Sequence, residues 1–153
     1  VWMDFDLHRL PVFGDLREEN LKVLEALLET ISCPTGDFVI RQDSPAEYLY
    51  IILSGKVQIS FKPYDGVPIT ISHVEPGGLF GWSALIGSER YTSSVIVIEP
   101  LRALRIRGDE LRKLTRKNPE AGQEILNSLA DAISTRWKDA REQVKLMLEN
   151  GMR

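Results

Sequence analysis

The sequence is poor in the residues from which metal centres and hydrolytic sites are built. Its 153 residues include one cysteine, Cys33, and two histidines, His8 and His73. A single cysteine excludes a disulfide or a cysteine-built metal or iron–sulfur centre within one chain, and it is typical of a reducing cytosol. A metal-dependent enzyme needs clustered histidines and a carboxylate, and these two histidines lie far apart in sequence. We therefore expect a cytoplasmic protein that binds no metal and is not an enzyme.

Long apolar runs and a strong excess of one charge are also missing. The longest apolar run, Tyr48–Leu53, is far too short to span a bilayer, and the N-terminus shows no signal-peptide pattern. The formal net charge of −3 gives no basic footprint for nucleic acid. We expect neither a membrane nor nucleic acid as a partner of this chain alone, and its length suits one compact domain.

The first helix is predicted from a capping pattern and an apolar stripe. Asp15 and Glu18 stand three residues apart, which is the spacing of a capping box. Pro34 disfavours a helical residue before it, so we expect the helix to end at Cys33. The apolar residues on one face of this helix are Leu21, Leu24, Leu27, Leu28 and Ile31.

From residue 38 to residue 106 the apolar pattern changes to that of strands. Asp65-Gly66 is a strong hairpin signal, Ser54-Gly55 indicates a tight turn, and Glu99-Pro100 separates the last two strands. Many short strands punctuated by turns are typical of a sandwich or small barrel. The predicted strands cover residues 38–40, 48–53, 57–61, 69–74, 92–98 and 103–106.

Helical periodicity returns after Gly108. We expect Asp109 to cap a short helix that Asn118-Pro119 ends, and a long helix to run from about Glu120 to Asn150. Its apolar residues repeat at alternating steps of four and three, as in the seam of a coiled coil. This stripe predicts a homodimer, although the first half of the helix is expected to pack on its own domain. The stripe consists of Leu126, Ala130, Ile133, Trp137, Ala140, Val144 and Met147.

The segment from Leu79 to Val95, called the cassette below, is the candidate binding segment. It follows the turn Pro76-Gly77-Gly78, and Gly81 leads into a few residues that tolerate a helix. Free backbone N–H groups at a helix start attract anions. We therefore expect a small anion to dock here, with strands before the cassette as support and helices after it to report its state.

Several stretches resemble the cyclic nucleotide-binding domain of the Crp/Fnr-type bacterial regulators, the catabolite-activator and fumarate–nitrate type. They are Gly36–Asp43, Ala46–Val57, Pro76–Gly81, Asp109–Leu111 and Asn118-Pro119. The resemblance implies an α+β fold, an antiparallel β-roll or jelly roll (a double-stranded β-helix) flanked by an N-terminal helix and a long C-terminal dimerisation helix. It assigns residues 1–118 to the domain and residues 119–153 to the long helix, and we expect no DNA-binding domain within this sequence.

The residues that hold the nucleotide in that family differ here. The resemblance places a glutamate for the ribose 2′-hydroxyl at Trp82, and an arginine for the cyclic phosphate at Tyr91, with Arg90 just before it. Trp82 is either a stacking platform for a flat ligand or a plug of the ribose space. Arg90 is either a phosphate ligand or a solvated loop residue, and Tyr91 is either a phosphate donor or an ordinary core or surface residue.

The remaining candidate ligands follow from the same resemblance. They comprise the cassette entry, two backbone N–H donors, two hydroxyls, and two residues of the long helix at the level where the family contacts the base. The full set of candidate ligand-binding residues is Phe80, Gly81, Trp82, Ser83, Ala84, Arg90, Tyr91, Thr92, Ser93, Ser134 and Thr135.

Three functions are consistent with these patterns. The first is an effector-sensing regulatory domain that binds a non-standard cyclic nucleotide, another small anionic effector, or none. The second is a ligand-free dimerising scaffold with a degenerate cassette, and the third is a cupin-type enzyme. No cofactor beyond such an effector is expected.

Overall fold

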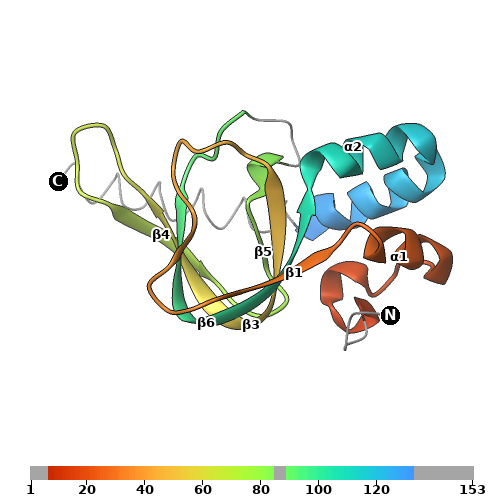
Figure 1. The fold of residues 1–153 in the computed structure, drawn as a ribbon, viewed down its shortest axis with the longest axis horizontal. Coiled ribbons are helices and arrows are strands. Elements are labelled where there is room, and N and C mark those ends of the chain that lie inside the picture. The colour runs from red at the N-terminus through yellow and green to blue at the C-terminus, as the bar shows by residue number, and fades with distance from the viewer. Residues whose placement is uncertain (1–6, 85–88, 133–153) are drawn as a thin grey trace.

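The fold is a β-roll with its helices gathered at one end (Figure 1). The computed structural model describes residues 7–84 and 89–132. The predicted fold class, an α+β antiparallel β-roll flanked by an N-terminal helix, is confirmed. In chain order the elements are η1 (Leu7–Arg9), η2 (Pro11–Phe13), α1 (Glu18–Glu25), β1 (Glu29–Cys33), β2 (Phe38–Ile40), β3 (Tyr48–Phe61), β4 (Ile69–Val74), β5 (Leu79–Phe80), η3 (Trp82–Ala84), β6 (Ser94–Arg107) and α2 (Gly108–Lys117), followed by a helix over residues 119–132.

Two long antiparallel strands form the spine of the roll. β3 and β6 each have 14 residues, and they pair from Tyr48↔Arg107 to Ser60↔Ser94. β1 and β2 add to different parts of β6, and β4 and β5 to different parts of β3, all antiparallel. The hairpin predicted at Asp65-Gly66 joins β3 to β4.

The predicted turn at Ser54-Gly55 and the predicted break at Glu99-Pro100 are wrong, because both strands continue through these positions. The pairing shifts register here instead. Gly55 has φ +92°, and a Cβ added to it would lie 2.1 Å from the carbonyl oxygen of Pro100. Glycine and proline facing each other in this way bend the paired strands without ending them.

The predicted first helix is wrong at both ends. α1 begins at Glu18 with Arg17 at its N-cap, so Asp15 does not cap it, and the helix ends at Glu25. Residues 29–33 form β1, which pairs with β6 from Glu29↔Arg105 to Cys33↔Leu101. Ile31 therefore lies in a strand, because a ladder to a distant segment outweighs a local helical pattern.

The core has two parts, which the alternation of side chains along β3 and β6 keeps apart. The helix-facing cluster joins one face of these strands, including Leu49 and Leu104, to α1 and to the helix at 119–132. The roll cluster fills the inside of the roll and includes Ile52, Phe80 and Val97. None of the helices within the described residues is long and apolar enough to cross a membrane.

Candidate functional site

The cassette begins where β5 pairs with β3, at Tyr50↔Phe80. Gly81 follows with φ +81°, and a Cβ added there would lie 2.8 Å from the carbonyl oxygen of Tyr48. A side chain does not fit between the cassette and β3, so glycine is required at this position. The cassette entry is thus held tightly against the strand that precedes it.

The short helix after Gly81 is a single 3₁₀ turn, η3. The Ala84 N–H donates to the carbonyl oxygen of Gly81 at 3.2 Å, and the Ser83 and Ala84 side chains are buried. One of the two backbone donors expected to face an anion is therefore used within the turn itself. Three residues also build little of the dipole that makes a longer helix attractive to anions.

Tyr91 is buried among the residues of the roll cluster. Its hydroxyl donates to the carbonyl oxygen of Tyr48 and accepts the Tyr48 N–H at 2.9 Å. Burial raises the pKa of the Tyr91 phenol well above its ordinary value. The Tyr91 side chain, at the position where the resemblance leads us to expect a phosphate-binding arginine, is thus neutral, buried and satisfied by the backbone of β3.

The segment around Arg90 is joined to the loop between β2 and β3. The Arg90 Nη1 donates to the carbonyl oxygen of Asp43 at 2.6 Å, and the Tyr91 N–H donates to Ser44 O at 2.9 Å. Pro45 and Arg90 form an isolated antiparallel bridge. The exposed Arg90 side chain therefore binds the backbone of a neighbouring loop in this structure.

Trp82 packs against a different part of the core from Tyr91. Its half-buried side chain packs against the helix-facing cluster, while the roll cluster contains Tyr91 and the stacked pair Tyr50 and Phe80, whose ring centroids lie 4.8 Å apart. Two aromatic residues of the cassette, Phe80 and Tyr91, therefore lie in the roll cluster, whereas Trp82 contacts the helix-facing cluster. The stacking-platform and plug hypotheses for Trp82 both stay predictions.

The far end of η3 is held by α2. Arg112 Nη1 donates to the carbonyl oxygen of Ala84 at 3.0 Å, and its Nη2 contacts Asp109. The N-cap of α2 is Arg107 rather than the expected Asp109, and the Arg112 hydrogen bond holds the pKa of the Asp109 carboxyl below its usual range. Sequence reasoning missed Arg112; its only signal is the three-residue spacing from Asp109.

The other candidate residues are placed as follows. Thr92 is exposed and Ser93 half-buried, whereas Ser94, which was not predicted, accepts the Gln42 N–H at 2.9 Å. Ser134 and Thr135 lie outside the described residues. Within residues 7–84 and 89–132, no three residues of the types His, Cys, Asp and Glu are grouped to hold a metal ion.

The predicted dimer seam is described only at its start. Leu126 is half-buried against the helix-facing cluster, and Ala130 is exposed. The face of this helix that packs on its own domain carries Ala121, Ile125 and Leu129, all buried. The other seam positions, Ile133, Trp137, Ala140, Val144 and Met147, lie outside the described residues.

Comparison with known proteins identifies several similar domains. A family model described as cyclic nucleotide-binding domain matches residues 30–118. The CRP-like cAMP-activated global transcriptional regulator of Mycobacterium tuberculosis is 30% identical over 128 residues, covering 84% of this chain. The acetyltransferase Pat of Mycolicibacterium smegmatis is 35% identical over 96 residues, covering 63% of this chain. A crystal structure described as a cyclic nucleotide-binding protein from Geobacter metallireducens matches with a TM-score of 0.74 and 33% identity, over 86% of this chain and 95% of that one.

The two relatives extend well beyond the aligned part. This chain spans 57% of the length of the mycobacterial regulator and 28% of the length of the acetyltransferase. Similar domains therefore occur both in a transcriptional regulator and in an enzyme.

Proposed function

Because this chain belongs to the cyclic nucleotide-binding domain family of the Crp/Fnr type, we propose that it is an effector-sensing regulatory domain that does not hold cyclic AMP or cyclic GMP in the family's manner. The observation that carries the proposal is Tyr91. Its buried hydroxyl is bonded to the Tyr48 backbone at the position where the family has a phosphate-binding arginine. The domain acts by binding rather than by catalysis, in the cytoplasm.

The energetic cost of the lost contacts supports this proposal. A hydrogen bond to a charged group contributes about 1.5–3 kcal/mol, so loss of the arginine alone weakens nucleotide binding about ten- to a hundredfold. Trp82 in place of the ribose glutamate removes a second contact. Arg90 does not replace the arginine without releasing the carbonyl oxygen of Asp43, which it binds.

A ligand-free scaffold is the second candidate, and the attachments of the cassette favour it. The cassette is bonded to β3 through Tyr91, to the β2–β3 loop through Arg90, and to α2 through Arg112. These contacts, made by residues of the chain itself, hold the described parts of the cassette and reduce the ordering that a ligand would have to supply.

Calorimetry separates the two candidates. The domain is titrated with cyclic AMP, cyclic GMP, cyclic di-AMP and cyclic di-GMP, with a family member that carries both the glutamate and the arginine as positive control. If the domain is a sensor, we expect saturable heat of binding with a ligand other than cyclic AMP and cyclic GMP. If it is a ligand-free scaffold, we expect no heat of binding with any of the four nucleotides. Micromolar binding of cyclic AMP at one site per chain contradicts both.

We also propose that the long helix forms a homodimer through its apolar stripe, so that its position reports the state of the cassette to an output domain. Ala130 is exposed and belongs to the stripe. We expect Ala130→Glu to halve the mass found by light scattering at a fixed concentration, because two buried like charges repel across a two-fold axis. The control Ala26→Glu makes the same change at another exposed alanine and leaves the mass unchanged. An unchanged mass in Ala130→Glu contradicts the seam.

A further inference from the structure

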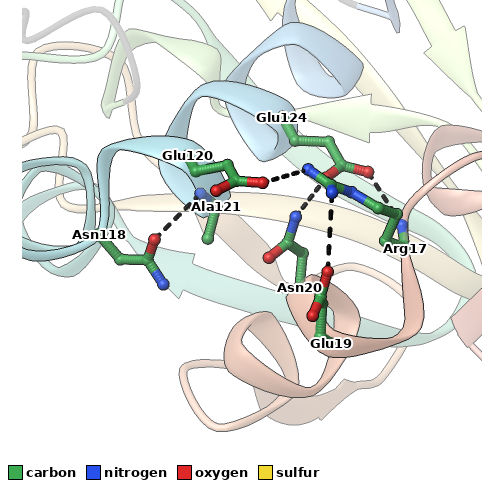
Figure 2. A network of polar contacts seen from close by, with 7 residues as sticks. All are labelled: Arg17, Glu19, Asn20, Asn118, Glu120, Ala121 and Glu124. Atoms are coloured by element: carbon green, nitrogen blue, oxygen red, sulfur yellow. Dashed lines mark hydrogen bonds and ion pairs between the residues drawn. The ribbon is translucent and has the colours of Figure 1, made fainter.

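The start of α1 is completed by a carboxylate from another helix. Arg17 is the N-cap of α1, and its own side chain makes no capping hydrogen bond. Instead, the Arg17 backbone N–H donates to Glu124 Oε1 at 2.9 Å, and Arg17 Nε donates to Glu124 Oε2 at 3.1 Å. Figure 2 shows Glu124 reaching from the helix at 119–132 to the Arg17 backbone and guanidinium. A carboxylate at this place is favourable because the first N–H groups of a helix have no partner within it.

Further contacts extend this network. The buried Asn20, in the first turn of α1, donates its side-chain N–H to Glu124. Arg17 Nη2 donates to Glu120 Oε1 at 2.8 Å, and Arg17 Nη1 lies 3.7 Å from Glu19. Arg17 and Asn20, at the start of α1, thus bind two carboxylates of the helix at 119–132. These carboxylates, Glu120 and Glu124, stand one turn apart.

We propose that Arg17 and Glu124 form a latch that couples α1 to the helix at 119–132, so that a shift of this helix releases the first turn of α1. α1 has only eight residues, fewer than a helix needs to persist alone in water. Hydrogen bonds weaken steeply with distance and angle, so a small shift of Glu124 breaks the contacts to Arg17 and Asn20 together.

The latch lies at the end of a continuous path from the cassette. Arg112 in α2 binds the carbonyl oxygen of Ala84. α2 packs closely on the next helix, since a Cβ added at Gly122 would lie 2.7 Å from the Cα of Thr115. Asn118 Oδ1 accepts the Ala121 N–H at 3.2 Å and caps this helix (Figure 2). Only the step in which an effector moves the helix rests on the proposed function; the latch itself does not.

Hydrogen exchange with a double-mutant cycle tests the latch. The Asn20 and Leu21 amides, which donate to the carbonyl oxygen of Arg17 at 3.0 and 2.9 Å, report the first turn of α1. We expect Arg17→Ala and Glu124→Ala each to speed their exchange about tenfold, and the double variant to add little more. Arg116→Ala, which removes an exposed arginine of α2, is the control and leaves these rates unchanged.

Two results overturn the latch. The first is unchanged exchange at Asn20 and Leu21 in both single variants. The second is an equal acceleration throughout the roll, because that pattern reports global unfolding and assigns the contacts no local role. Because the measurement uses no effector, it tests the latch even if the proposed function is wrong. Conversely, a result that contradicts the latch does not contradict the proposed function of the cassette.

The latch is expected to weaken in acid. The Arg17 backbone N–H, followed by Asn20 and the Arg17 guanidinium, holds the pKa of the Glu124 carboxyl below its ordinary value of 4.5. A group with a lowered pKa in the folded protein stabilises it above the unfolded pKa, and this contribution is lost as the pH falls through the folded value. Arg17, the cation paired with Glu124, also pairs with the carboxylates of Glu120 and Glu19, so these groups share its guanidinium.

Urea denaturation between pH 5 and pH 3 checks this dependence. We expect the stability of Glu124→Gln to fall less steeply with pH over this range than that of the parent, because the variant has no carboxylate to protonate. The stability of Glu124→Gln is still expected to fall with pH, because the pKa of the Asp109 carboxyl is also lowered in the folded protein. Parallel pH profiles for the parent and Glu124→Gln contradict the assignment.

Discussion

Replacing Tyr91 with phenylalanine is expected to lower the free energy of unfolding by about 2 kcal/mol, within the 1–3 kcal/mol typical of unsatisfied buried groups. The hydroxyl binds both the N–H and the carbonyl oxygen of Tyr48, and phenylalanine keeps the ring but removes this partner from both groups. Tyr91→Ala is expected to cost about 3–5 kcal/mol, since it also empties the space of a large ring in the roll cluster. Urea denaturation measures both differences.

Tyr64 provides the matched control for this series. Its side chain is 99% exposed, so Tyr64→Phe and Tyr64→Ala are expected to change stability by less than about 0.5 kcal/mol. If Tyr91→Phe is as stable as the parent, the phenol does not hold β3 to the cassette. The same result removes the observation that carries the proposed function, the bonding of the Tyr91 hydroxyl to the Tyr48 backbone.

Replacing Gly108 with alanine is expected to detach the cassette from α2 and to cost about 2–3 kcal/mol. The added Cβ would lie 2.3 Å from the carbonyl oxygen of Ala84, which is also the acceptor of Arg112. The Gly108 N–H donates to Glu47 O at 2.9 Å, so the residue cannot move away without losing a second contact. Backbone faces backbone here, and no flexible side chain can absorb the strain.

Gly14 provides the control for Gly108, because alanine fits at Gly14 without strain. It has φ −59° and ψ −33°, and an added Cβ would meet nothing closer than 3.7 Å. Gly14→Ala is therefore expected to be neutral or to stabilise the protein by up to about 1 kcal/mol. Hydrogen exchange over residues 82–84 should rise in Gly108→Ala and not in Gly14→Ala. Equal stability of the two variants would contradict this prediction, because it would mean that the close contact of Gly108 with Ala84 contributes little to stability.

The strands could largely be predicted from the sequence, because alternation and turn residues are local signals. The hairpin at Asp65-Gly66 and the strand at 69–74 needed no knowledge of their partners. β1 could not be found in this way, since Ile31 continues an apolar helical stripe and its strand exists only through pairing with β6. The bend at Gly55 was missed for a related reason: a glycine and a proline separated by 45 residues act as one feature only when they face each other.

The place of the cassette in the fold could be predicted from the sequence, but the arrangement of its side chains could not. The motif at Gly81 located the cassette, and Tyr91 was a candidate because of where it stands. Which way its hydroxyl points depends on the Tyr48 backbone, 43 residues earlier. Arg17 and Glu124 carried no motif at all, because the contact that joins them spans 107 residues of chain. Sequence patterns give the elements of such sites, and only the fold brings their side chains together.

The central claim is that Tyr91, at the position where the family has a phosphate-binding arginine, uses its hydroxyl to bind the Tyr48 backbone, so that the domain does not hold cyclic AMP in the family's manner. The most direct measurement is a nuclear magnetic resonance titration of the labelled domain with cyclic AMP, followed at the Tyr48 amide. We expect this resonance to stay at its position up to millimolar cyclic AMP, with the Tyr91 hydrogen bonds intact. A saturable shift of the Tyr48 amide, at a concentration matching binding by calorimetry, would contradict the claim.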